Sequence, residues 1–189
     1  MYKFFAFMNR KKYIERWSLM RSTVKENIME HSEQVAEIAH ALALIRNTYF
    51  GGNLNADKIA VYALYHEASE VITGDLPTPI KYYNPAINQA YKELEKVASD
   101  KLEKTLPTEL QSLYSDYLNP DGEEKIIVKA ADKLAAYIKC IEEISVGNKE
   151  FVKAKASIGK TLESYTLPEV KYFIENFIPA FSLTLDELE

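Results

Sequence analysis

Apolar side chains recur along most of the chain at steps of three and four residues, and convincing alternation at every second position is absent. This period is typical of helices that bury one face. The clearest run puts apolar residues on one side of a helix at Ile28, Val35, Ile38, Leu42 and Ile45. The pattern therefore predicts an all-α fold, in which the second helix runs from Asn27 or Glu30 to Arg46.

The same period predicts the other helices and their breaks. The expected ranges are Phe4–Trp17, Ala56–Thr73, Asn88–Leu106, Thr108–Leu118, Glu123–Ser145, Glu150–Ser164 and Pro168–Asn176. Gly74 is a natural end for the helix from Ala56, and the prolines that follow favour extended backbone at Leu76 and Thr78. We expect a single domain over residues 1–189, built as a bundle of roughly eight helices.

Composition narrows the class of protein. The chain has 189 residues, which suits one domain, and its net charge of −5 gives no basic footprint for a nucleic-acid polymer. Cys140 is the only cysteine, so an internal disulfide is excluded and a reducing compartment is expected. No run approaches eighteen apolar residues, so no membrane span is expected. These features together predict a cytoplasmic protein.

The candidate chemistry centres on the stretch YHEASEVITGDLPTP at residues 65–79. On a continuous helix His66 and Glu70 would share a face, with Glu67 about 100° away around the axis. His31 lies on the apolar stripe of the preceding helix, whereas His40 lies on a different side. Imidazoles and carboxylates on core-facing surfaces need a metal, a charge or a hydrogen-bond network as partner.

A further carboxylate, Asp132, lies beside the inward stripe of the helix expected at Glu123–Ser145. Three helices thus each bring a residue that could bind a metal to a core-facing surface, and two imidazoles with carboxylates suit Mn, Co, Fe or Zn better than calcium. Other interpretations stay open from spacing alone. His31 could be a satisfied core histidine, Asp132 could pair with Lys129 or Lys133, and Glu67 and Glu70 could form a solvated face.

The order of a histidine, a histidine followed by a carboxylate, and a distant aspartate resembles the HD phosphohydrolase superfamily. The closer resemblance is to the bacterial 5′-deoxynucleotidases of the YfbR type. It rests on ERWSLMR at 15–21, ENIMEHSEQVAEIAHALA at 26–43, FGGNLNADKIAVYALYHEASEVITGDLPTPIKYYN at 50–84, KAADKLAAYIKCIEEI at 129–144 and FIPAFSLTLDE near the end.

The resemblance implies a metal-dependent hydrolysis of deoxyribonucleoside 5′-monophosphates to nucleoside and phosphate, by a homodimer. The implied ligands of one divalent transition metal, Co, Mn or similar, are His31, His66, Glu67 and Asp132. Glu70 would activate or orient the attacking water, Arg16 would orient the phosphate, and Trp17 would contact the nucleotide. The sugar side of the pocket would be lined by Asp75, Leu76, Pro77 and Thr78, with His31, Glu67 and Asp132 also facing the substrate.

One position departs from the family pattern, because Glu67 stands where an aspartate follows the second histidine. The extra methylene bears on metal preference more than on reaction type. Two alternatives stay open: hydrolysis of another nucleotide phosphate ester, and a nucleotide-binding protein with impaired turnover. Arg16 offers a planar fork for phosphate, although a surface charge at a helix end is an arginine's commoner role. Trp17 could equally be a core residue.

Overall fold

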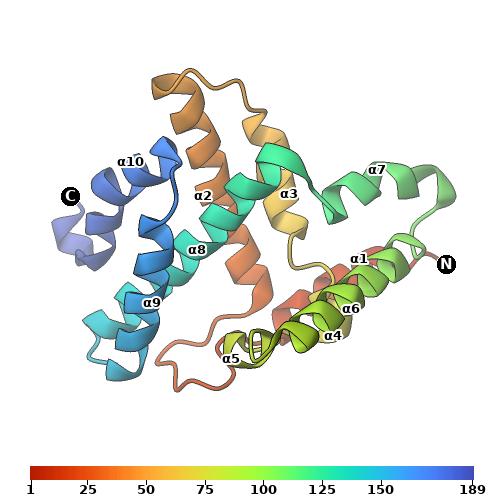
Figure 1. The fold of residues 1–189 in the computed structure, drawn as a ribbon, viewed down its shortest axis with the longest axis horizontal. Helices are drawn as coiled ribbons and strands as arrows, with labels where there is room; N and C mark the ends of the chain where they lie inside the picture. Colours follow the sequence, from red (N-terminus) through yellow and green to blue (C-terminus); the bar gives the residue numbers. More distant parts are fainter. The chain divides into compact units, whose positions relative to one another are not determined.

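The computed structural model describes all of residues 1–189, and all its regular elements are helices (Figure 1). Its only β pairing is one isolated antiparallel bridge between Glu15 and Asn27. The all-α prediction is therefore confirmed. No helix combines the length and the apolar character needed to cross a membrane.

The α-helices are α1 (Phe4–Met8), α2 (Ile28–Tyr49), α3 (Ala56–Tyr65), α4 (Glu70–Thr73), α5 (Thr78–Lys81), α6 (Pro85–Glu103), α7 (Thr108–Leu118), α8 (Gly122–Ser145), α9 (Val152–Glu163) and α10 (Pro168–Asn176). Short 3₁₀ segments are η1 (Asn9–Tyr13), η2 (Lys149–Phe151), η3 (Ile178–Ser182) and η4 (Leu185–Glu187). Backbone contacts group the chain into two compact units that interleave in sequence. The single domain expected over residues 1–189 stays a prediction.

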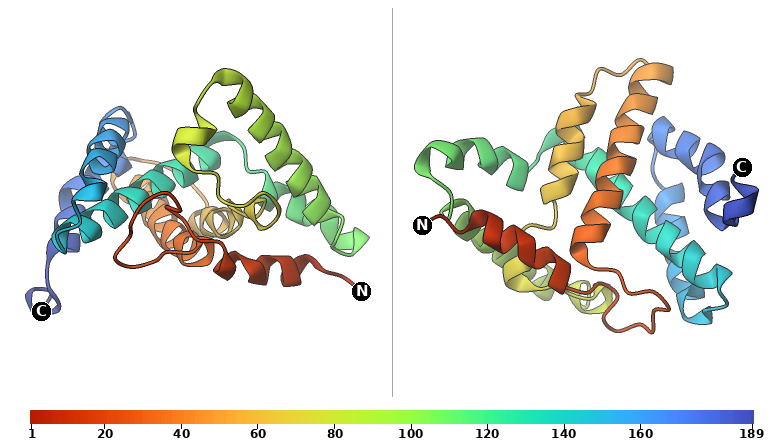
Figure 2. Two further views of the ribbon diagram at one scale, coloured as in Figure 1. Left: turned by 90° about the horizontal axis from the view of Figure 1, so that it is seen from below. Right: turned by 180° about the vertical axis from the view of Figure 1, so that it is seen from behind.

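The first unit comprises Met1–Arg21, Lys25–Glu33 and Leu64–Pro120. Within it, α1 and α4 both pack against α6 (Figures 1 and 2). Its buried cluster consists of Phe4, Met8, Ala68, Leu102, Leu106 and Leu118. Tyr114 packs on this cluster, with its ring 5.0 Å from that of Phe4. The α1 segment, one and a half turns long, is thus held mainly by burial of aromatic surface.

The second unit comprises Ser22–Val24, Gln34–Ala63 and Asp121–Glu189. In it α9 lies along α8, and η3 contacts both α8 and α10 (Figure 2). The inward stripe expected on α8 is confirmed, because its members are buried: Ile127, Ala131, Leu134, Ile138 and Ile141. Cys140 is also buried, as expected for a thiol among apolar neighbours.

The predicted first helix, Phe4–Trp17, is wrong beyond Tyr13. The α-helix ends at Met8, a 3₁₀ segment follows, and the chain then turns away through Trp17, whose φ is 58°. The Arg16 N–H donates to the Glu26 carbonyl at 2.9 Å instead of continuing a helix. A pairing with a segment ten residues later thus ends the helical stretch.

The predicted continuous helix from Ala56 to Thr73 is also wrong, because α3 ends at Tyr65 and α4 begins at Glu70. In an unbroken helix the Leu64 carbonyl would accept a hydrogen bond from the Ala68 N–H. Here the Leu64 carbonyl accepts from Lys11 Nζ at 2.8 Å, and the Ala68 N–H bonds to the Tyr65 carbonyl at 2.9 Å. Residues 66–69 therefore form tight turns.

The segment just after Gly74 differs from expectation at Thr78 and at the start of α6. Thr78 is not extended, since it opens the four-residue helix α5, in which Pro79 occupies a first-turn position that needs no donor. Helix α6 begins at Pro85 rather than Asn88, because Asn84 caps it by accepting from the Ile87 N–H at 2.8 Å. The ranges predicted for α7 and α10 are confirmed.

Candidate functional site

His31 owes its place to the start of α2. The side chain of Asn27 accepts hydrogen bonds from the N–H groups of Met29 and Glu30, at 3.0 and 3.1 Å. In return, the Glu30 carboxylate accepts a hydrogen bond from the Asn27 N–H at 3.1 Å. This reciprocal capping box fixes the first turn of α2. His31 therefore projects from that turn, on the apolar side, with its side chain fully buried.

His66 and Glu67 lie in the turn between α3 and α4, next to His31. The two imidazole centroids are 5.5 Å apart, and Glu67 Oε1 lies 3.2 Å from His66 Nε2. One donor atom from each of His31, His66 and Glu67 lies within 4.8 Å of the other two. Ligands bonded to one ion at about 2.1 Å lie roughly 3 to 4 Å apart, so a small adjustment would let these three share a metal.

Glu26 is a site residue that sequence reasoning missed. Its Oε1 lies 3.2 Å from Nδ1 of His31, the arrangement by which a carboxylate orients a metal-binding imidazole. Burial opposes ionisation of Glu26, but hydrogen bonding to His31 and the charge of Arg16 outweigh it and lower its pKa. No local sequence signal marks this role. Glu26 precedes α2, and the capping by Asn27 and Glu30 already explains why the helix starts there.

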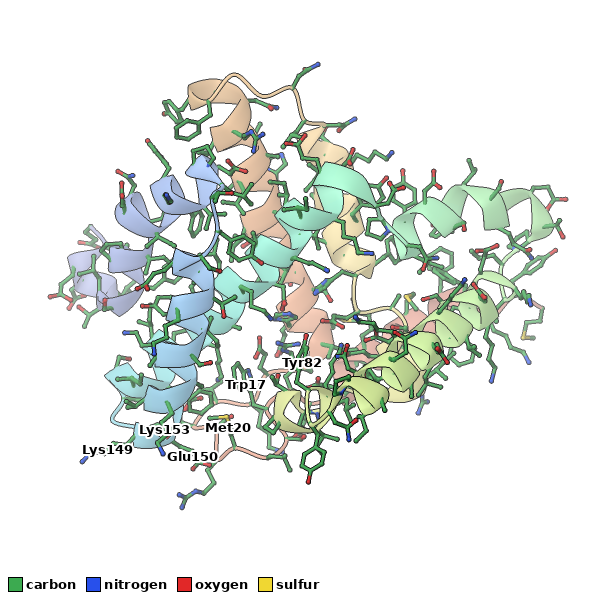
Figure 3. The ribbon with its side chains drawn as sticks, viewed as in Figure 1. Trp17, Met20, Tyr82, Lys149, Glu150 and Lys153 are labelled. Atoms are coloured by element: carbon green, nitrogen blue, oxygen red, sulfur yellow. The ribbon has the colours of Figure 1, made fainter.

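Arg16 and Trp17 both contact Glu26 from the stretch between η1 and α2, on which Figure 3 labels Trp17. Arg16 lies 3.6 Å from Glu26 and 3.8 Å from Glu67, and its side chain is largely buried. The Trp17 indole N–H donates to Glu26 at 2.7 Å. Arg16 therefore does not have the surface position that was left open as its alternative role; it lies beside Glu26 and Glu67.

Two neighbouring carboxyls, Glu67 and Glu70, have opposed acidities. Burial disfavours the charge on Glu67, but His66, a hydrogen bond with Glu70, and Arg16 outweigh burial and hold the pKa of Glu67 below its usual range. Burial and the charge of Glu67 raise the pKa of Glu70 to about 11. Glu70 Oε2 is buried without a hydrogen-bond partner. Two neighbouring carboxyls with pKa values shifted in opposite directions are typical of sites that bind a cation or move a proton.

Lys11 is a second residue that the sequence did not single out. Its buried Nζ donates to Ser32 Oγ at 2.7 Å and to the Leu64 carbonyl at 2.8 Å. Burial lowers the pKa of Lys11 to about 8, against the opposing charges of Glu67 and Glu70. Lys11 thereby links Ser32, which follows His31, to Leu64, which lies two residues before His66.

The segment expected to line the sugar side follows Gly74, which has a φ of 73°. The Tyr91 hydroxyl donates to the Gly74 carbonyl at 3.2 Å and fixes the start of this segment. Asp75, Leu76 and Pro77 are partly buried, whereas Thr78 is exposed. Burial raises the pKa of Asp75, although Arg16 opposes the shift.

The remaining candidates lie in the second unit. Asp132 is partly buried on α8, and one of its oxygens lies 3.1 Å from Lys133 Nζ. The lysine contact considered as an alternative is therefore present and engages one carboxylate oxygen. His40 is half-exposed, with its Nε2 3.4 Å from Asp57 Oδ1.

Comparisons with known proteins identify the family of the chain. A model of the family of YfbR-like 5′-deoxynucleotidases matches residues 3–181. Proteins of Yersinia pestis strain Pestoides F and Yersinia pseudotuberculosis serotype O:3, both named 5′-deoxynucleotidase, are 56% identical over 188 residues, which is 98% of this chain and 95% of theirs.

Solved structures share the fold. An HD-domain phosphohydrolase from Listeria innocua is 24% identical with a TM-score of 0.84, over 95% of this chain and 88% of that one. The HD phosphohydrolase of cyanophage S-2L, solved with dA and one catalytic Zn²⁺ ion, is 19% identical with a TM-score of 0.63, over 92% of this chain and 95% of that one. With its paired histidines and nearly full-length match, the chain belongs to the YfbR-like 5′-deoxynucleotidase family, within the HD-domain fold.

Proposed function

We propose that this protein hydrolyses 2′-deoxyribonucleoside 5′-monophosphates to deoxyribonucleoside and phosphate, using one bound divalent transition metal. The observation that carries the proposal is the convergence of His31, His66 and Glu67 within 4.8 Å, with Arg16 beside them, in a member of a deoxynucleotidase family. Paired imidazoles and a carboxylate are a donor set for a metal such as Co or Mn.

Three residues of the first unit would hold the metal, with Asp132 of α8 as the fourth ligand. His31 is already oriented by Glu26, and Glu67 Oε1 faces the His66 imidazole, so these donors need little rearrangement. When bound, the metal supplies a Lewis acid for a phosphoryl oxygen and a water whose pKa is lowered. Glu67 offers the charged donor that an aspartate gives elsewhere in the family.

The residues around the donors supply positioning. Arg16 presents a guanidinium fork beside Glu67, where it would bind two phosphate oxygens and hold the phosphorus in line with the attacking water. Glu70 Oε2 is buried and lacks a hydrogen-bond partner, so it can accept a hydrogen bond from that water and then its proton. A cation beside Glu67 would favour the ionised form of Glu70, which this step requires.

Selectivity for the sugar would come from Trp17 and the segment after Gly74. We expect Asp75 to accept a hydrogen bond from a sugar hydroxyl, with Leu76, Pro77 and Thr78 beside it. Trp17 or this proline-rich segment would form the wall that leaves no room for a 2′-hydroxyl. In the alternative, Glu67 impairs turnover and the protein only binds nucleotides. This alternative is disfavoured because the Glu67 carboxylate lies with the imidazole donors.

The test is phosphate release from dAMP and AMP by metal-stripped protein, with Mn²⁺, Co²⁺, Mg²⁺ or Zn²⁺ added back. We expect metal-dependent release from dAMP, little from AMP, and loss of at least a hundredfold in Glu70→Gln, whose side chain keeps its size but not its basicity. Folded protein that releases no phosphate from dAMP with any of the four metals would contradict the proposal. Equal release from dAMP and AMP would support the phosphatase activity and would reject the proposed selectivity for deoxyribose.

We also propose that the protein is cytoplasmic, as its composition predicts, and that it is a homodimer, as the resemblance implies. The support for the compartment is the composition, with its single buried cysteine. Light scattering on the purified protein should give twice the mass of 21.6 kDa. A mass of one chain at micromolar concentration would reject the dimer without bearing on the chemistry.

A further inference from the structure

The residues proposed to bind the nucleotide, Arg16 and Trp17, lie on a closed loop between η1 and α2 (Figure 3). The base of this loop is paired, since the Arg16 N–H donates to the Glu26 carbonyl at 2.9 Å and the Ile28 N–H donates to the Ile14 carbonyl at 3.0 Å. Trp17 has a φ of 58°, a conformation that a bulky residue keeps only where the surrounding contacts hold it.

The tip of the loop is held by one buried carboxylate, Glu143 of α8. Glu143 Oε2 accepts from the Thr23 N–H at 2.9 Å and from the Thr23 hydroxyl at 2.7 Å. Its Oε1 accepts from the Val24 N–H at 3.3 Å. The side chain of Glu143 is 1% exposed, whereas Thr23 and Val24 are exposed, so these bonds join a buried carboxylate to a surface loop.

Lys139, one turn earlier on α8, completes the arrangement. Its Nζ donates to Glu143 Oε1 at 2.7 Å and to the Val24 carbonyl at 2.6 Å. Asn148 donates to Glu143 Oε2 at 2.8 Å. Glu143 and Lys139 thus bind the backbone of Thr23 and Val24 and, in addition, the Thr23 hydroxyl. We call this set of hydrogen bonds, made by Glu143 and Lys139, the Glu143 clamp.

We propose that the Glu143 clamp is a positioning device for the loop that carries Arg16 and Trp17, an inference that rests on the proposed function. A buried ion pair contributes little stability compared with apolar residues of the same size, so stability alone is a weak reason for one here. Apart from the bond with Asn148, the side-chain hydrogen bonds that Glu143 and Lys139 make outside α8 go to Thr23 and Val24 at the loop tip. Fixing the tip as well as the base leaves Trp17 little freedom to leave its strained conformation.

The experiment compares Thr23→Val, which removes the hydroxyl but keeps the shape, with Thr23→Ser, which keeps the hydroxyl. Trp17 is the only tryptophan, so acrylamide quenching of its fluorescence reports on the loop directly. We expect Thr23→Val to increase quenching and to raise the KM for dAMP about threefold to tenfold, with kcat within about twofold, while Thr23→Ser resembles the parent. Glu143→Gln should act in the same direction and more strongly.

Glu142→Gln is the matched control, because it changes the neighbouring exposed carboxylate of α8 and should leave both readouts unchanged. If Thr23→Val lowers only the melting temperature, with quenching and KM unchanged, the clamp is merely structural and the inference is overturned; this comparison decides even where Glu143→Gln does not fold. If quenching rises in Thr23→Val but the parent hydrolyses no dAMP, the clamp stands and the proposed function fails.

Discussion

At the scale of single residues, Glu67 shows how the family pattern tolerates a longer side chain. Its Oε1 lies 3.2 Å from His66 Nε2 and 3.8 Å from Arg16. The backbone at residues 66–69 forms tight turns rather than a continuous helix, so Glu67 does not take the direction that helical geometry would give it. The carboxylate therefore stays beside its imidazole despite the additional methylene.

Replacing Glu67 with glutamine tests whether this carboxylate is a ligand. Glu67→Gln keeps the size but loses the charge, so we expect the affinity for Co²⁺ or Mn²⁺ to fall about tenfold to a hundredfold, as measured by competition with a chelator. Glu67→Asp is the control that restores the family's usual residue and retains binding. An unchanged affinity in Glu67→Gln would remove Glu67 from the ligand set.

At the scale of elements, α8 contains both a predictable and an unpredictable surface. Its apolar stripe is predicted by the three- and four-residue spacing of apolar residues, and the burial of these residues confirms the prediction. Lys139 and Glu143, four residues apart, have the spacing of an ordinary exposed ion pair, yet both are buried. Their burial depends on Thr23 and Val24, which are 115 to 120 residues away in the sequence.

The Glu143 clamp predicts a specific response to acid. Burial opposes the charge of Glu143, but hydrogen bonds from Lys139, Thr23 and Asn148 outweigh it and lower the pKa from 4.5 to about 2. Because the folded pKa lies below the ordinary value, the stabilisation is fully present above about pH 4.5 and is lost as the pH falls toward 2.

Urea unfolding of the parent and Glu143→Gln at several pH values measures this contribution. At pH 7 we expect the variant to lose about 3 kcal/mol in free energy of unfolding, because Lys139 stays buried without its counter-charge. The difference between the two proteins should narrow between pH 5 and pH 3. A difference that is constant over that range would show that Glu143 has the same pKa in the folded and unfolded chains.

At the scale of the whole molecule, the donor atoms come from segments far apart along the chain. His31 belongs to the first turn of α2, His66 and Glu67 follow α3, and the proposed fourth ligand, Asp132, belongs to α8. An ion that binds all four would join these segments and would bind only the folded chain. Such binding stabilises the fold by mass action.

Metal addition should therefore raise the melting temperature of the stripped protein. At about one hundred times the dissociation constant the gain is about 2.7 kcal/mol, which for a chain of this size corresponds to roughly 5 to 10 °C. Scanning fluorimetry with and without Co²⁺ measures the shift. We expect His66→Ala to abolish it and Asp132→Asn to reduce it, whereas His40→Ala, outside the donor group, should keep it. A full shift in Asp132→Asn would exclude that residue as a ligand.

The sequence by itself determined the helical class, the apolar stripes, the ranges of α7 and α10, and the residues that could bind a metal. These follow from local periodicity and from the order of a motif. Only the tertiary structure decided where the helices break and which charges support the site. Lys11 takes the Leu64 carbonyl from 53 residues away, and Glu26 holds Arg16, Trp17 and His31 together. The physical reason is that a long-range hydrogen bond can replace a local one with the same donor or acceptor, and no local pattern records which of the two the folded chain makes.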